Sequence, residues 1–223
     1  MKIISVRKGF ASDHSSTSYE FLAVDKPLSK FARATVASLS SRAHPTARRV
    51  SFTYNAEGYD LPGGWHNLML HHYDVMYSES YDWWILAMAF DAPEKLQQAA
   101  AEYDFDGDDG QGVEVTIDGN RIIVGIHCRL DLGMAYAYDH DEGYNDEDED
   151  DDDIDTNDYL LSLLTRIRGQ LIQGDFRALY EVWKVYGWDD DEEDDLLTPP
   201  VPPEKDTGQE ILQELREKLV SVW

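Results

Sequence analysis

Cysteine and long apolar runs are almost absent from this chain, and each absence narrows its class. The 223 residues include a single cysteine, Cys128, so no disulfide can form within the chain. Such cysteine usage is typical of a reducing cytoplasm, where we expect the protein to act. The longest apolar run, residues 83–90, is far shorter than the roughly 20 residues that cross a bilayer. We therefore expect no membrane partner.

Positive charge is also scarce, and it is unevenly placed. The chain has 19 Lys and Arg against 45 Asp and Glu, a formal net charge of −26. Residues 1–55 are basic, whereas residues 56–223 are strongly acidic. Because phosphate contacts need concentrated positive charge, direct nucleic-acid binding is not expected. We expect a protein partner with a basic surface, although a need for solubility explains the charge equally well.

The chain does contain enough apolar material for a folded core. Hydrophobic residues make up 42% and aromatic residues 12% of the sequence, which argues against wholesale disorder. Residues 113–118 and 121–130 alternate in polarity around an Asp-Gly-Asn turn, which predicts a β-hairpin. Residues 82–90 are apolar on both alternating faces, as in a central strand. Helices are predicted at 65–76 and, from a D-x-x-E capping box, after 91–94.

These elements predict an α+β fold in five parts. Residues 1–138 form a core domain with one mixed, mainly antiparallel sheet and about three helices. Residues 139–157 are expected to form an acidic, disordered linker, because like charges repel and little apolar surface can be buried. An appended αα-hairpin follows at 158–187. Residues 188–206 form an acidic, proline-rich linker that favours an extended polyproline II spacer, and residues 207–223 form a C-terminal helix.

Each helix of the predicted hairpin has an apolar face for which the sequence names no partner. The acidic tracts on either side repel and extend, which would keep the hairpin accessible. We predict that the two helices dock on another protein through six side chains, namely Leu164, Ile167, Leu171, Leu179, Tyr180 and Trp183.

The same region resembles known proteins. Residues 163–183 read LLTRIRGQLIQGDFRALYEVW, and PPVPP follows at 199–203 after an acidic tract. This order resembles the tail of a broad set of uncharacterised bacterial proteins, with a leucine-rich helix, a GD-x-R-x-LY-x-x-W segment, an acidic stretch and PPVPP. Residues 6–21 loosely resemble the R-x-G…N-S-S-S start of other uncharacterised phage and bacterial proteins. The resemblance implies a bacterial origin and carries no activity.

The densest cluster of reactive side chains is the loop at residues 12–18, SDHSSTS. Nucleophilic catalysis needs a hydroxyl, a base and an acid that converge in space, and neighbours on a loop seldom do so. A hydrogen-bonded turn is the commoner role for such a loop. With the basic residues nearby, an anion- or partner-binding site is the alternative that we favour. Its predicted residues are Arg7, Lys8, His14, Ser15, Ser16, Arg42, Arg48 and Arg49.

No cofactor or metal site is predicted. The loop at 104–112 begins with the D-x-D-x-D spacing of a calcium site, but Val115 stands where the closing Glu is needed. His66, His71 and His72 lack the spacing that places two metal ligands on one helix face. The sequence also has neither a P-loop nor a dinucleotide-binding fingerprint.

These observations favour a non-enzymatic protein–protein interaction or regulatory protein with acidic tracts. One alternative is that the tracts at 139–157 and 189–195 mimic a nucleic acid or act as an autoinhibitory tail. They would then occupy a basic groove on a partner or this chain's own residues 42–49. A further alternative is a hydrolase that uses the loop at 12–18 or the region from His66 to Asp82.

Overall fold

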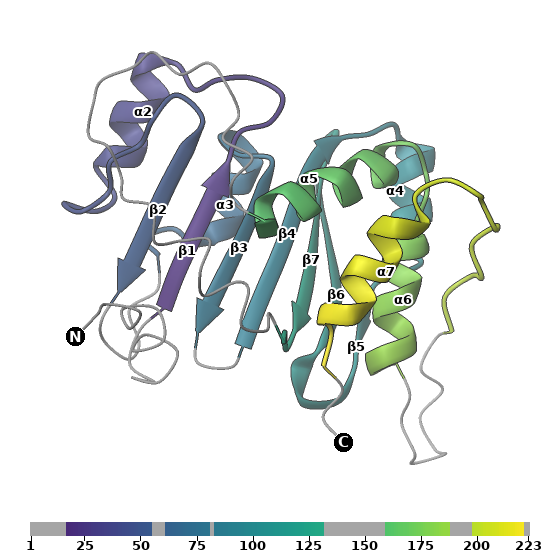
Figure 1. The fold of residues 1–223 in the computed structure, drawn as a ribbon. Coiled ribbons are helices and arrows are strands. Elements are labelled where there is room, and N and C mark those ends of the chain that lie inside the picture. The colour runs from purple at the N-terminus through teal and green to yellow at the C-terminus, as the bar shows by residue number, and fades with distance from the viewer. Residues whose placement is uncertain (1–16, 55–60, 81–82, 132–158, 188–197, 221–223) are drawn as a thin grey trace, which may run out of the picture.

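The computed structural model of this chain describes residues 17–54, 61–80, 83–131, 159–187 and 198–220 (Figure 1). In these residues, seven strands form one antiparallel sheet in the order β2-β1-β3-β4-β7-β6-β5. The strands are β1 (Thr17–Leu22), β2 (Arg49–Tyr54), β3 (Val75–Ser80), β4 (Trp83–Asp91), β5 (Phe105–Asp106), β6 (Gly112–Asp118) and β7 (Arg121–Cys128). The helices of the same residues are α2 (Lys30–Ala37), α3 (Gly64–His71), α4 (Glu94–Ala101), α5 (Tyr159–Ile172), α6 (Arg177–Tyr186) and α7 (Gln209–Lys218), with a 3-10 turn η1 (Asp108–Gly110). The α+β class is as predicted.

Two local predictions are confirmed by the sheet. Strands β6 and β7 form the expected hairpin, with Asp118 paired to Arg121. Gly119 lies in the turn at a φ of 59°, which glycine adopts without strain. Strand β4 is buried on both faces, since Leu86 and Ala87 belong to the hydrophobic clusters on opposite sides of the sheet.

Two boundaries were predicted wrongly. The helix expected at residues 65–76 ends at His71, and Val75 begins strand β3 between β1 and β4. Residues Val75, Met76 and Tyr77 are all buried, so this inner strand lacks the polar alternation that marks a half-exposed strand. The D-x-x-E capping box is also absent, because Pro93 occupies the N-cap position of α4 and Asp91 ends strand β4.

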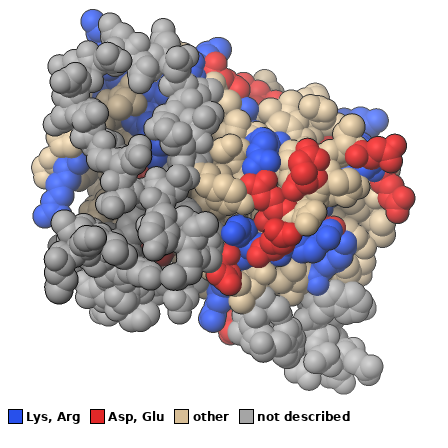
Figure 2. Space-filling model, viewed as in Figure 1, with Lys and Arg blue, Asp and Glu red and all other residues tan. Residues whose placement is uncertain are grey.

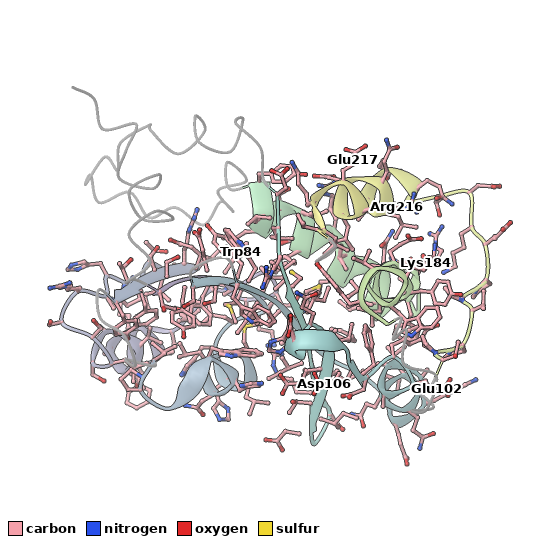
Figure 3. The ribbon with its side chains drawn as sticks, turned by 90° about the horizontal axis from the view of Figure 1, so that it is seen from below. Trp84, Glu102, Asp106, Lys184, Arg216 and Glu217 are labelled. Atoms are coloured by element: carbon pink, nitrogen blue, oxygen red, sulfur yellow. The ribbon has the colours of Figure 1, made fainter. Side chains whose placement is uncertain are left out.

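Helices cover the sheet on both faces, as the view from below shows (Figure 3). Helices α2 and α3 pack on one face, around Phe21, Phe52 and Tyr73. Helices α5, α6 and α7 pack on the other face, around Leu86 and Ile126, and α4 contributes Ala100 to that same cluster. In strands β1, β3, β4 and β7, the buried apolar residues are shared between the two layers.

The helical hairpin buries the side chains that were expected to dock on a partner. Leu164, Ile167, Leu171 and Leu179 are completely inaccessible in the cluster between α5, α6 and the sheet. Trp183 is 8% exposed. The half-buried ring of Tyr180 stacks on the Trp183 ring, with 5.4 Å between the ring centroids. The docking prediction is therefore corrected, because the chain's own sheet covers this apolar face. The sequence pattern shows that a helix face is apolar and does not show which surface meets it.

Several predicted segments lie outside the described residues. They are the acidic tracts at 139–157 and 189–195 and most of the loop at 12–18. In the described ranges, no helix is both long and apolar enough to cross a membrane.

Candidate functional site

The predicted basic site is divided by the structure. Arg7, Lys8, His14, Ser15 and Ser16 lie outside the described residues. The others are Arg42, which is exposed, and two arginines with internal contacts. The guanidinium of Arg48 donates to the carbonyl oxygens of Ala23 and Val24, both at 3.0 Å. That of Arg49 lies 3.5 Å from the buried Glu20 carboxylate.

The charges on the face formed by α5, α6 and α7 compensate one another. Basic and acidic side chains interleave there (Figure 2). Arg166 pairs with Glu214 at 2.6 Å, and Glu181 pairs with both Arg216 and Lys184. These ion pairs leave no uniform charge on the described part of this face.

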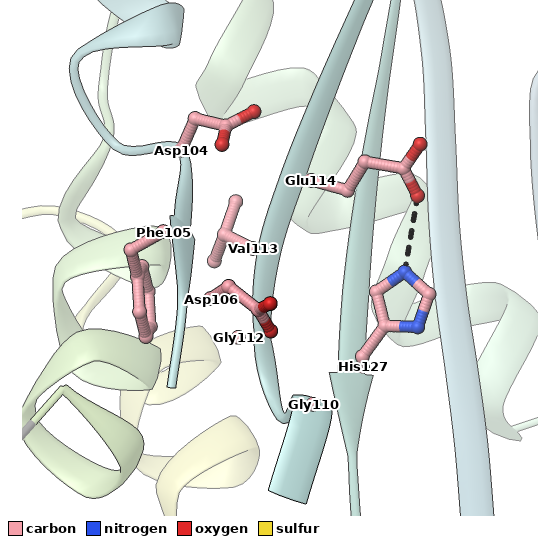
Figure 4. A pocket seen from close by; sticks show the side chains of 8 residues that line it. All are labelled: Asp104, Phe105, Asp106, Gly110, Gly112, Val113, Glu114 and His127. Atoms are coloured by element: carbon pink, nitrogen blue, oxygen red, sulfur yellow. Dashed lines mark hydrogen bonds and ion pairs between the residues drawn. The ribbon is translucent and has the colours of Figure 1, made fainter. Parts of the chain in front are cut away.

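A small pocket of about 280 Å³ lies among β5, η1, β6 and β7 (Figure 4). Three carboxylates and one imidazole contribute to its wall, and neither Lys nor Arg is among the described residues that line it. The lining residues are Asp104, Phe105, Asp106, Gly110, Gly112, Val113, Glu114 and His127.

The register of the hairpin places the two central residues of this pocket together. Glu114 on β6 lies opposite Gly125 on β7, and His127 lies two residues further along β7. Side chains two residues apart on a strand share one face of the sheet. Because Gly125 has no side chain, the ring of Trp65 on α3 approaches the strand, 3.5 Å from where a Cβ at Gly125 would lie. Helix α3 thereby brings His66 to the same carboxylate.

Glu114 is held between two imidazoles. Its Oε1 lies 3.0 Å from Nε2 of His66, and its Oε2 lies 3.1 Å from Nε2 of His127. An ionised carboxylate only accepts hydrogen bonds, so each Nε2 carries the proton. The hydroxyl of Thr116 also donates to Oε1, at 3.2 Å. Burial alone would raise the pKa of Glu114, but the His127 hydrogen bond and the charge of His66 outweigh it and lower that pKa below 4.5.

Two of the three aspartates in the D-x-D-x-D sequence line the pocket, and they have different roles. The carboxylate of Asp104 accepts a hydrogen bond from the backbone N–H of Val115 at 2.8 Å. Val115 lies beyond the two residues of β6 that pair with β5, so the side chain of Asp104 supplies the acceptor for this edge N–H group. Asp106, at the end of β5, is exposed at the pocket mouth. Among the described residues, no group of three His, Cys, Asp or Glu side chains has the geometry to hold a metal ion.

The arrangement fits the binding of a cation better than nucleophilic chemistry. The described lining residues include no Ser, Thr, Cys or Lys, and the nearby Thr116 hydroxyl donates to Glu114 itself. By contrast, three carboxylates line this one cavity, and their charges create the negative potential that concentrates a positively charged group.

The sequence contained part of this site. The Asp-Gly-Asn turn fixes the hairpin register, and this register places Glu114 and His127 on one face. Neither residue has a local signal for this pairing, because each lies among the alternating positions of an ordinary strand. The approach of His66 depends on the packing of α3 and has no local signal.

The GD-x-R segment, which carried the resemblance to bacterial proteins, forms an internal clamp. The buried Arg177 guanidinium donates from Nε and Nη2 to the Asp175 carboxylate at 2.9 and 2.8 Å. It also donates to the carbonyl oxygens of Lys205 and Thr207, at 2.8 and 2.6 Å. The clamp fastens the chain that follows PPVPP to the start of α6.

We predict that Glu114→Gln removes a stabilisation that depends on pH. The pKa of Glu114 is lower in the folded chain than in the unfolded chain, so ionisation stabilises the fold above pH 4.5. This stabilisation is lost as the pH falls through the pKa that Glu114 has in the folded chain. Because the side chain is 41% exposed, the expected loss at pH 7 is about 0.5 kcal/mol.

Urea unfolding followed by tryptophan fluorescence measures this loss. The gap between variant and parent should narrow as the pH is lowered below 4.5. Glu102→Gln, at an exposed position after α4, is the control. An equal gap at pH 7 and pH 3.5 would contradict the predicted proton linkage.

Comparisons of this chain with protein-family models, with curated proteins and with solved structures find no match. The class of the protein therefore rests on its own fold and site. The described residues form an α+β fold with a seven-stranded antiparallel sheet and an acidic pocket at one end of that sheet.

Proposed function

We propose that this protein is a non-enzymatic binding protein that recognises a basic surface on a partner protein. The pocket beside β6 and β7 would receive a Lys or Arg side chain of that partner. The observation that carries this proposal is one cavity lined by Asp104, Asp106 and Glu114 and by no Lys or Arg in the described lining.

Charge and geometry both support a cationic side chain as the occupant. The net charge of −26 steers a basic partner towards the chain over long distances. At close range, the exposed carboxylate of Asp106 offers oxygens that accept from a guanidinium or ammonium group, and Glu114 adds its negative charge. The histidines at either side of Glu114 fix its orientation, which reduces the conformational entropy that binding would otherwise cost.

A hexa-arginine peptide is a suitable probe of this pocket. We expect Asp106→Asn combined with Glu114→Gln to weaken its binding about tenfold in 150 mM salt, where charges more than about 8 Å apart are largely screened. Fluorescence anisotropy of the labelled peptide against the full chain gives the dissociation constants.

The matched control is Glu102→Gln combined with Glu210→Gln. Both residues are exposed, and the pair removes the same net charge away from the pocket. This control should change the affinity less than twofold. Equal weakening by the two double variants would mean that the general acidity of the chain, and not the pocket, attracts the peptide.

The two alternatives from the sequence stay predictions. The acidic tracts of the proposed nucleic-acid mimic lie outside the described residues. So does most of the loop proposed for a hydrolase, except Thr17 and Ser18, which belong to β1. The Thr17 hydroxyl lies 2.9 Å from that of Ser80, which is a contact between paired strands.

A further inference from the structure

The PPVPP segment has a conformation that its sequence largely dictates. Residues 198–205 form neither helix nor strand. Proline fixes its own φ near −65°, and a residue that precedes proline is restricted to extended or polyproline II conformations. Four residues in this segment precede a proline, namely Thr198, Pro199, Val201 and Pro202. The segment is therefore expected to be a short polyproline II helix, which has three residues per turn.

Burial along the segment follows that three-residue period. Pro199 is buried, and Pro202 is half-buried, so this ridge faces the protein. Pro200 and Pro203 are exposed and form a second ridge, with the P-x-x-P spacing, that faces outward. Beside that ridge lies Val201, which is 73% exposed.

The segment is fastened at both ends. The Tyr103 hydroxyl donates to the carbonyl oxygen of Pro200 at 2.8 Å. Burial, the largest effect, and nearby negative charges raise the pKa of Tyr103 to about 12, so this donor keeps its proton near neutral pH. At the other end, Arg177 holds the carbonyl oxygens of Lys205 and Thr207. Figure 1 shows the segment at the outer edge of the molecule, before α7 begins.

We propose that residues 199–203 are a docking segment for a partner protein whose groove is lined with aromatic side chains and flanked by basic ones. Aromatic grooves bind P-x-x-P segments because the polyproline II helix is already ordered and little entropy is lost on binding. The contacts from Tyr103 and Arg177 add to that order. This inference concerns a different surface from the acidic pocket and does not depend on it.

The flanking charges define the rim of the partner groove. Glu204 and Asp206 are exposed, and the acidic run at 189–195 precedes the prolines in the sequence. The ammonium of Lys205 lies 3.4 Å from the Asp175 carboxylate, so its charge is compensated within the chain. A groove with basic residues at its rim therefore fits this segment better than one with acidic residues.

A panel of purified SH3 and WW domains, with grooves of different rim charge, tests the proposal by titration against the full chain. We expect binding by domains with basic rims, and we expect Pro200→Ala combined with Pro203→Ala to weaken it at least about tenfold, as truncation of central contacts does. Both prolines are exposed, so the thermal unfolding midpoint should change little.

The matched control is Gln213→Ala combined with Glu217→Ala. These residues form an exposed hydrogen-bonded pair on the nearby helix α7, and this variant should bind as the parent does. Two results would overturn the proposal. One is that no domain of the panel binds the full chain. The other is that the double proline variant binds as tightly as the parent.

Discussion

Replacing Arg168 with alanine is expected to lower the free energy of unfolding by about 3–5 kcal/mol, the usual cost of leaving a buried charge without its partner. The Arg168 side chain is 5% exposed. It donates to the carbonyl oxygen of Ala89 at 2.7 Å and makes two hydrogen bonds to the Asp25 carboxylate. Its Nη2 lies 3.7 Å from the buried carboxylate of Asp74.

The large effect follows from the position of Asp74 between two layers of the fold. Its Oδ1 accepts from Arg121 at 2.9 Å, and Arg121 also donates to the carbonyl oxygens of Met69 and Tyr73 at the end of α3. Arg168 reaches the same carboxylate from α5, on the other face of the sheet. The two arginines and Asp74 therefore link the helical layers. The loss of Arg168 removes the Ala89 carbonyl's side-chain donor and one of the two guanidinium groups beside the buried Asp74 carboxylate.

Urea and thermal unfolding measure this effect, and the melting temperature should fall by roughly 10 °C for a chain of this size. Arg166→Ala is the matched control, because Arg166 lies on the same helix and pairs with Glu214 while 38% exposed. Its removal should cost less than about 1 kcal/mol. Similar losses for the two variants would contradict the proposed role of Arg168.

Arg177→Ala is the second substitution with a large expected effect, again about 3–5 kcal/mol. Arg177 and Asp175 are each 7% exposed, so the variant leaves a buried carboxylate whose main partner is gone. Burial alone would raise the pKa of Asp175, and the hydrogen bonds from Arg177 lower it instead. We expect that pKa to rise in the variant, so the fold should lose further stability at higher pH relative to the parent.

The control for this experiment is Lys205→Ala. The ammonium of Lys205 also approaches Asp175, at 3.4 Å, but its side chain is 37% exposed, so its loss should cost under about 1 kcal/mol. The free energy of unfolding of Arg177→Lys should be close to that of Arg177→Ala. The reason is that an ammonium group cannot donate to the carboxylate and to two carbonyl oxygens in the fork geometry of a guanidinium. A fully stable Arg177→Lys variant would show that charge alone suffices at this position.

The sequence predicted the elements whose signals are local. The hairpin of β6 and β7 follows from alternation and an Asp-Gly-Asn turn, and α5 and α6 follow from apolar residues at helical spacing. The polyproline II conformation expected for residues 199–203 rests on proline geometry in the same local way. In each of these cases, residues close together in the chain determine the backbone conformation, so a short window contains the physical information.

Prediction failed where a residue's environment comes from distant parts of the chain. Strand β3 is buried on both faces, so nothing in residues 75–80 alternates in a way that distinguishes it from the end of a helix. The predicted anion site likewise grouped arginines that lie near one another in the sequence. In the fold, the guanidinium of Arg48 instead donates to the carbonyl oxygens of Ala23 and Val24, which follow β1.

By itself, the sequence determined an acidic α+β chain with a definite hairpin, amphipathic helices and a proline-rich segment. Only the tertiary structure decided that Leu164 and Ile167 cover this chain's own sheet, and that His66 meets Glu114. It also decided that Arg177 holds the chain after the prolines. The physical reason is that apolar periodicity indicates which face of a helix or strand must be buried. The surface that covers this face is selected by the packing of the whole chain.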